Sequence, residues 1–186
     1  MIQTALHPDI ETLLFSYEEL QDRTRALGRQ ISEAYAGKSP LLVGVLKGAV
    51  HFFADLAKSV TADCAYDFVS VSSYEDGTES SGTVQLRKDL DTDIAGRDVL
   101  LVDDIMDSGL TLQYLSMLFR SRGAASVRIC VLLDKPERRS TDISADYVGF
   151  VIPNRFVVGY GLDYRQKYRN LPYIGILKPE KYTDSL

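Results

Sequence analysis

The sequence predicts a single α/β domain built on a mainly parallel β-sheet with helices on its flanks. Two short, continuous apolar runs, at residues 41–46 and 99–102, and a third run at 127–133 that only Arg128 interrupts, are typical of strands that are buried on both faces. Segments with helical periodicity separate these runs, and this alternation is characteristic of parallel sheets with crossover helices. The length of 186 residues fits one domain with a small appendage.

The first helix carries its own start and stop signals. Ser16 and Glu19 have the spacing of a capping box, and Gly37 is a suitable stop for the apolar-periodic segment that follows them. The other expected elements are, in chain order, a helix at 49–60, a strand at 65–71, a polar Gly/Ser-rich loop at 73–85, a helix around 112–119 closed by Gly123, and a strand at 147–152.

Composition and charge exclude several classes of function. The formal net charge is -5 and no block of Lys and Arg stands out, so nucleic acid and membrane surfaces are not expected partners. The longest apolar stretch, at 40–57, is interrupted by charged residues and cannot span a bilayer. Cys64 and Cys130 have neither disulfide-framework nor zinc-site spacing, and two reduced thiols suit the cytoplasm.

An acid pair directly follows the apolar run at 99–102. In parallel sheets, ligands bind outside the carboxyl ends of the strands, which makes Asp103 and Asp104 candidate ligand contacts. Ionised carboxylates only accept hydrogen bonds, so two neighbouring ones suit a pair of vicinal hydroxyls or a hard cation such as Mg²⁺.

The segment from Asp107 to Thr111 joins this strand to the start of a helix. Unpaired backbone N–H groups and the positive end of the helix dipole would accommodate a phosphate there, and Gly109 would allow its close approach. An equally open alternative is that Asp107 or Ser108 merely caps the helix. A ribose 5-phosphate would satisfy both features, because its diol suits the acid pair and its phosphate suits the loop.

Two other protein classes contain a similar run of aspartates but fit this sequence less well. The DDxxD box of isoprenyl diphosphate synthases lies on a helix of a large all-α protein, whereas here a strand precedes the acids. A response-regulator receiver domain places its acid pair near the domain start, and too little chain follows residue 104 for the rest of that fold.

The stretch VLLVDDIMDSGLTL, residues 99–112, closely resembles the phosphoribosyl pyrophosphate (PRPP) signature of type I phosphoribosyltransferases. Further segments resemble the hypoxanthine (6-oxopurine) branch of that family, and the last of them is the most specific. They are LKGA at 46–49, SSY at 72–74, DKPERR at 134–139 and FVVGYGLDYRQKYRN at 156–170. The matches run in order from residue 41 to residue 177.

The resemblance implies how PRPP is bound. Asp103 and Asp104 would hold the ribose hydroxyls and, directly or through water, the Mg²⁺ cofactor. The remaining PRPP contacts would be Asp107, Ser108, Gly109, Leu110 and Thr111 around the 5-phosphate, Lys47, Gly48 and Arg169 at the pyrophosphate, and Ser73 and Tyr74 at the start of a lid. Lys47 is expected to act through an unusual backbone geometry at the Leu46–Lys47 bond.

The resemblance also implies a base site. Asp107 would be the catalytic residue, which takes or relays the proton of purine N7. Lys135 would donate to the 6-oxo group, and a donor-only side chain disfavours a 6-amino group. Phe156 would stack on the base, the Val157 backbone would contact its edge, and Asp163 would help to hold a second Mg²⁺ beside it.

Two positions depart from the family pattern. The family usually has Glu-Asp where this chain has Asp103-Asp104, so direct contact from the shorter Asp103 to ribose or metal is less secure. Ser108 replaces the commoner Thr, which should be harmless.

The implied protein is a purine-salvage enzyme of the cytoplasm. It would transfer the phosphoribosyl group of PRPP to N9 of hypoxanthine or guanine and form a homodimer or homotetramer. The single domain 1–186 would consist of a core at about 37–150, a hood from 1–36 and 151–186, and a mobile lid at 73–85. Two alternatives stay open, namely an RNA-binding regulator on the same fold and a phosphoribosyltransferase for another base such as a pyrimidine.

Overall fold

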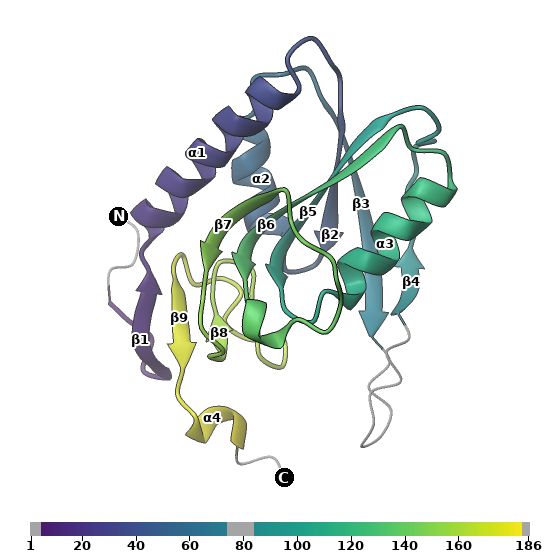
Figure 1. Cartoon of the computed structure of the whole chain (residues 1–186). Coiled ribbons are helices and arrows are strands. Elements are labelled where there is room, and N and C mark those ends of the chain that lie inside the picture. Colours follow the sequence, from purple (N-terminus) through teal and green to yellow (C-terminus); the bar gives the residue numbers. More distant parts are fainter. Residues whose placement is uncertain (1–4, 74–83, 184–186) are drawn as a thin grey trace.

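The three apolar runs form the centre of a six-stranded sheet in the computed structural model, which describes residues 5–73 and 84–183 (Figure 1). The strand order is β4-β3-β2-β5-β6-β7, with only the edge strand β4 antiparallel to its neighbour. The strands are β2 (Leu41–Leu46), β3 (Ala65–Ser73), β4 (Val84–Lys88), β5 (Asp98–Met106), β6 (Ser126–Asp134) and β7 (Tyr147–Val151). This is the mainly parallel sheet that the sequence predicts.

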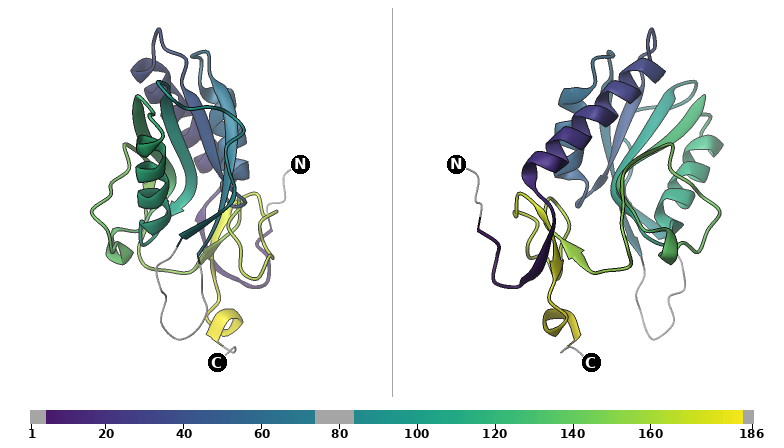
Figure 2. Two further views of the ribbon diagram at one scale, coloured as in Figure 1. Left: turned by 90° about the vertical axis from the view of Figure 1, so that its right-hand side faces the viewer. Right: turned by 60° about the vertical axis from the view of Figure 1, so that its left-hand side comes forward.

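Helices cover both faces of this sheet. Helices α1 (Tyr17–Ala34) and α2 (Val50–Ser59) lie on one face, and α3 (Leu110–Ser121) lies on the other (Figure 2). Because side chains alternate along a strand, Leu100 packs with α1 and α2, whereas its neighbour Leu101 packs with α3. The continuous apolar runs are thereby explained, since both faces of the central strands are buried.

The predicted capping box starts α1. The Glu19 backbone N–H donates to Ser16 Oγ at 3.2 Å, and the Ser16 backbone N–H donates to Glu19 Oε2 at 2.8 Å. Helix α1 ends at Ala34, and Gly37 just beyond it has a φ of 73°. Both boundary signals read from the sequence are confirmed.

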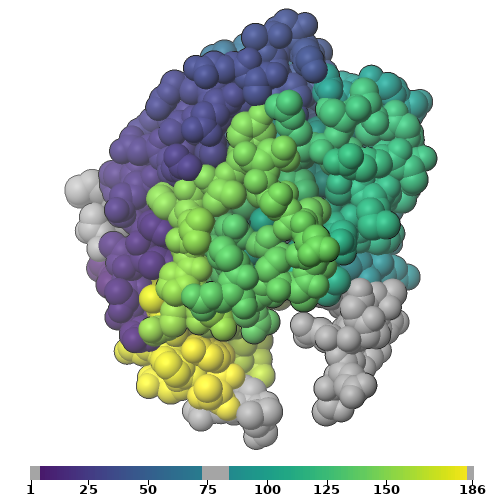
Figure 3. Space-filling view, viewed as in Figure 1, coloured from purple at the N-terminus to yellow at the C-terminus, as the bar shows by residue number. Residues whose placement is uncertain are grey.

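A second, smaller sheet lies beyond the carboxyl ends of the core strands (Figure 1). Strands β1 (Ile10–Phe15), β9 (Ile174–Leu177) and β8 (Val157–Val158) pair antiparallel in that order, and we call them the hood sheet. In Figure 3 the purple N-terminal and yellow C-terminal segments accordingly adjoin at the surface. Phe15 connects this sheet to the core, because its ring stacks on Phe150 of β7 with centroids 3.9 Å apart.

The boundary of the hood differs from the expected one. Helix α1 falls inside the expected hood segment 1–36, but its residues Leu20, Leu27 and Ile31 are fully buried in the main core with α2. From the N-terminal segment, the hood sheet takes only β1.

The expected lid is only partly within the described residues. Ser73 ends β3 and Val84 begins β4, whereas Tyr74 and the rest of the segment up to residue 83 lie outside them. Within 5–73 and 84–183, no helix combines the length and apolar character needed to cross a membrane.

Candidate active site

The loop between β5 and α3 leaves a helix N-terminus open. Gly109 is the N-cap residue of α3, with a φ of 86°, and it makes no side-chain cap hydrogen bond. A Cβ atom at this position would also crowd Arg139 Cδ and Ile143 Cγ2, each at 2.9 Å. Glycine is therefore required for both the conformation and the space. The Leu110 backbone N–H donates to Ser108 Oγ at 3.4 Å, so Ser108 partly caps α3, as the alternative interpretation allowed. The start of α3 also borders a hollow, where its N–H groups and helix dipole suit an anion.

We call this space the loop hollow, which measures about 100 Å³. Its walls are Asp103, Ile105, Met106, Asp107, Ser108, Gly109, Thr111 and Leu112. Four of the five sequence-predicted phosphate contacts, all except Leu110, thus line one concavity, with Asp103 beside them.

The last residue of the DKPERR motif and the two residues after it hold the carbonyl groups of this loop. The Ser140 backbone N–H and Thr141 Oγ1 donate to Ser108 O at 3.0 and 3.1 Å, and Arg139 Nε donates to Asp107 O at 3.2 Å. Arg139 is itself paired with Asp134. Sequence reasoning missed these supports, although the second arginine of the motif was a visible signal for one of them.

Asp103 and Asp104 are carboxylates in a desolvated setting. Asp103 is 8% exposed, and its Oδ1 accepts the Asp104 backbone N–H at 2.9 Å. Burial, and then the neighbouring charge of Asp104, hold the pKa of Asp103 well above its usual range. Burial also raises the pKa of Asp104, although the Ile105 backbone N–H and the positive charge of Arg169 oppose that rise. Such a pair favours a cation or hydroxyl donors, because burial penalises ionised acids that lack partners.

The Lys47–Gly48 loop packs directly onto this acid pair. The Leu46–Lys47 peptide bond is cis, which is the unusual backbone geometry predicted at this bond. A Cβ atom on Gly48 would collide with the Asp104 carboxylate, and one on Gly161 would collide with the Gly48 carbonyl oxygen. The turn at Gly161 and the Gly48 loop therefore meet beside Asp104, and close backbone approach is what positions them.

Arg169 lies next to this junction. Its Nη1 donates to Gly161 O at 2.6 Å, and its Nη2 pairs with Asp163 Oδ1 at 2.6 Å. Within the described residues its buried Nε has no hydrogen-bond partner, so one donor is available for an anion. Asp163 is held by this pair and by the Gln166 backbone N–H at 2.7 Å. It does not line the cleft that contains Lys135 and Phe156.

That cleft, which we call the Lys135 cleft, measures about 430 Å³. It brings the predicted Asp107, Lys135, Phe156 and Val157 together with six residues that sequence reasoning did not single out. The six are Ile105, Arg138, Asn154, Arg155, Leu162 and Tyr182. Its size is within the range of small-molecule sites.

Lys135 is a buried donor in this cleft. It is 7% exposed, and its backbone N–H donates to Met106 O at 3.0 Å, which ties it to the end of β5. Burial lowers the pKa of the Lys135 ammonium, an effect that the Asp107 charge opposes. A buried, donor-only group favours a ligand with an acceptor at that point.

Asp107 lines both the loop hollow and the Lys135 cleft. Its Oδ1 accepts from Arg138 Nε at 3.0 Å, and both side chains are substantially exposed, so this pair contributes little to stability. Asp107 therefore lies where the loop hollow and the Lys135 cleft meet.

Replacing Asp103 by Asn is expected to stabilise the ligand-free protein at neutral and higher pH. The pKa of Asp103 is raised on folding, so its ionised form costs stability that the protonated acid does not cost. The advantage of Asp103→Asn should therefore be absent below the unfolded pKa of 3.8 and grow as pH rises through the folded pKa. Each kcal/mol would raise Tm by roughly 2–4 °C in a chain of this size.

Differential scanning calorimetry without divalent metal, at about pH 5 and about pH 8, would measure this difference. Asp142→Asn, a substitution of an exposed carboxylate, is the matched control and should leave Tm unchanged. Equal Tm values for wild type and Asp103→Asn at both pH values would contradict the burial argument.

Comparison with known proteins identifies the family. The phosphoribosyl transferase domain family matches residues 16–165. The hypoxanthine-guanine phosphoribosyltransferase of Streptococcus thermophilus is 55% identical over 178 residues, which cover 96% of this chain and 99% of that protein. The bifunctional protein TilS/HprT of Listeria monocytogenes is 56% identical over 97% of this chain, but the chain spans only 28% of that protein's length.

Solved structures agree with this assignment. The crystal structure of a hypoxanthine phosphoribosyltransferase from Staphylococcus aureus superposes with a TM-score of 0.93 at 48% identity, and covers 98% of this chain and 99% of that one. A hypoxanthine phosphoribosyl transferase of Trypanosoma cruzi gives a TM-score of 0.92 at 40% identity. This chain therefore belongs to the phosphoribosyltransferase family, in the branch of the hypoxanthine-guanine enzymes.

Proposed function

We propose that this protein transfers the 5-phosphoribosyl group of PRPP to N9 of hypoxanthine or guanine, giving IMP or GMP and pyrophosphate. The observation that carries the proposal is the position of Asp107, on the shared border of the loop hollow and the Lys135 cleft. A phosphoribosyl donor in the hollow and a purine in the cleft would meet at this carboxylate. The names of the near full-length relatives support the same reaction.

The donor would be held by the loop hollow and the acid pair. Backbone N–H groups of the loop and the first turn of α3 suit the 5-phosphate, and Asp103 and Asp104 suit the ribose hydroxyls. The pyrophosphate would lie near the Gly48 loop, where the Arg169 Nε–H has no partner among the described residues and could donate to it. Breaking the bond from C1′ to pyrophosphate would then leave the charge of the leaving group next to a guanidinium.

The purine base would bind, and be recognised, in the Lys135 cleft. Lys135 would donate to the 6-oxo group, and Phe156 would stack on the ring. As N9 bonds to C1′, the proton on N7 becomes more acidic, and Asp107 would accept or relay it. The same geometry disfavours adenine, because a 6-amino group in place of the oxygen would leave the buried ammonium unpaired.

Mg²⁺ is proposed as the cofactor on the chemistry of the donor set. The described residues contain no group of three His, Cys, Asp or Glu side chains that could hold a metal by themselves. Mg²⁺ is commonly bound by one or two carboxylates together with substrate oxygens, and Asp103, which is buried, and Asp104, which is half-buried, are two neighbouring carboxylates with raised pKa. When bound, Mg²⁺ would neutralise charge on the pyrophosphate. Asp163, paired with Arg169, would be a candidate for a second ion.

The setting and the oligomeric state are part of the same proposal. A reducing, cytoplasmic setting fits the two free cysteines, Cys64 and Cys130. A homodimer or homotetramer rests on the family resemblance, and light scattering after size-exclusion chromatography would measure it.

Product formation from PRPP with hypoxanthine, guanine, xanthine, adenine and uracil, with and without EDTA, tests the proposed reaction. We expect IMP and GMP but neither AMP nor UMP, and we expect EDTA to abolish product formation because charged pyrophosphate would face uncompensated acids. Restoring Mg²⁺ in excess of EDTA is the control. AMP or UMP as the main product would reject the assignment of the base site, and product formation that resists EDTA would reject the metal.

A further inference from the structure

The C-terminal helix α4 (Glu180–Thr183) places an aromatic ring on the proposed base-stacking residue. The Tyr182 ring stacks on Phe156, with centroids 4.9 Å apart and planes at 21°. Tyr164 meets Phe156 edge-on at 5.5 Å and 88°. Phe156 is thus fixed by two aromatic neighbours, and Tyr182 also forms part of the wall of the Lys135 cleft.

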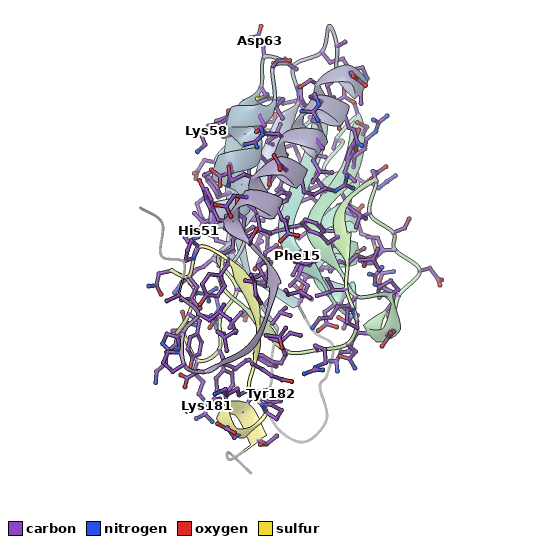
Figure 4. All side chains as sticks on the ribbon, turned by 90° about the vertical axis from the view of Figure 1, so that its left-hand side faces the viewer. Phe15, His51, Lys58, Asp63, Lys181 and Tyr182 are labelled. Atoms are coloured by element: carbon purple, nitrogen blue, oxygen red, sulfur yellow. The ribbon has the colours of Figure 1, made fainter. Side chains whose placement is uncertain are left out.

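The chain around α4 is held against Phe156 and the N-terminal segment. The Leu177 backbone N–H donates to Phe156 O at 2.9 Å, and the Lys178 backbone N–H donates to Asp9 O at 3.0 Å. Lys181 then forms an ion pair with Asp9 at 3.0 Å. Figure 4 shows Lys181 and Tyr182 on α4 at the lower end of the molecule. The position of Tyr182 is therefore determined by contacts that the residues just before it make with Phe156 and with Asp9.

Tyr182 borders the cleft without filling it. The volume of about 430 Å³ is what remains with Tyr182 in place, and it still suits a small planar molecule. One face of the Phe156 ring is covered by Tyr182, so a stacked base needs the other face. Tyr182 would accordingly support Phe156 from behind, rather than compete with the base.

We propose that Tyr182 is a positioning residue for the purine, acting through Phe156 in an ordered stack of base, Phe156 and Tyr182. The proposal rests on the proposed function, because it assumes a base stacked on Phe156. A Phe156 ring without its partner could turn or tilt, and the base would then have to order that ring on binding, which weakens affinity. Loss of one aromatic pair corresponds to a roughly three- to tenfold effect on binding.

Steady-state kinetics of Tyr182→Leu, with hypoxanthine and PRPP varied separately, tests this proposal. We expect KM for hypoxanthine to rise roughly three- to tenfold, while KM for PRPP and kcat stay within about twofold. Tyr182→Phe keeps the ring and should behave as wild type. Lys181→Ala, which removes the tether to Asp9, should raise KM for hypoxanthine by less. Glu180→Ala, an exposed change on the same helix, is the matched control.

The two proposals fail in different ways. If wild type makes no nucleotide from any base, the proposed function fails, whatever Tyr182 does. If wild type is active but Tyr182→Leu leaves KM for hypoxanthine unchanged, or raises both KM values equally, the stack is not a base-positioning device. Thermal unfolding of each variant separates a folding defect from a binding effect. A Tyr182→Phe variant that resembles Tyr182→Leu would also overturn the proposal, since it retains the stacking ring.

Discussion

Replacing Asp107 by Asn is expected to lower kcat roughly 10²- to 10⁴-fold, which is the usual contribution of a positioned general base. Asn has nearly the same shape and leaves the loop backbone intact, so the phosphate site should survive. KM for PRPP is therefore expected to change by about twofold at most. Rapid-quench or spectrophotometric assays of IMP formation would measure kcat and both KM values.

Two companion variants separate proton transfer from charge alone. Asp142→Asn removes an exposed carboxylate after the DKPERR motif and should retain full activity. Arg138→Gln removes the partner of Asp107 and should change kcat far less, because that pair is solvent-exposed. An Asp107→Asn variant with kcat within about threefold of wild type would exclude Asp107 as the base.

Replacing Lys135 by Met is expected to remove the discrimination between 6-oxo and 6-amino purines. Met keeps most of the apolar stem but has no donor for the 6-oxo group. A hydrogen bond to a charged group contributes about 1.5–3 kcal/mol, so kcat/KM for hypoxanthine should fall roughly 10- to 100-fold. The kcat/KM for adenine should fall much less. The ratio of kcat/KM for hypoxanthine to kcat/KM for adenine would measure the change.

Lys167→Met is a suitable control for this experiment, because Lys167 is exposed and does not line the Lys135 cleft. The folding of Lys135→Met should not suffer, since the substitution replaces a buried ammonium, which is costly to desolvate, by an apolar group. Equal losses for hypoxanthine and adenine would indicate that Lys135 shapes the cleft without reading the 6-position.

The core of the fold was predictable because its signals are local. The strand at 41–46 is a continuous apolar run, the strand at 127–133 is one except for Arg128, and the Ser16–Glu19 capping box is complete within four residues. The loop hollow was predictable for the same reason, since strand end, glycine and helix start follow one another in sequence. Its chemistry can be read without knowing the distant contacts of the chain.

The hood sheet was less predictable because its signals are not local. Strand β1 has a mostly exposed, irregular pattern, and its register with β9 shifts twice. Its partner, β9, is far away in sequence. The two strands are therefore not joined by a hairpin turn, which would have indicated the pairing. Tyr182 was missed for a related reason, because its contact with Phe156 depends on the path that the chain takes after β9. The ion pair of Asp163 with Arg169 was not predictable either, because it depends on how the turn between these two residues folds.

The pairing of β1 with β9 also affects the order in which the protein is completed during translation. A ribosome releases the chain from its N-terminus, and the core with the Asp107 loop can form while the C-terminal segment is still unmade. Strand β1 cannot pair until β9 has been synthesised, since Ile10 pairs with Leu177. Phe156, Tyr182 and the cleft that they line are made only after the core strands. A prematurely terminated chain would retain its phosphate loop and acid pair without a finished base cleft.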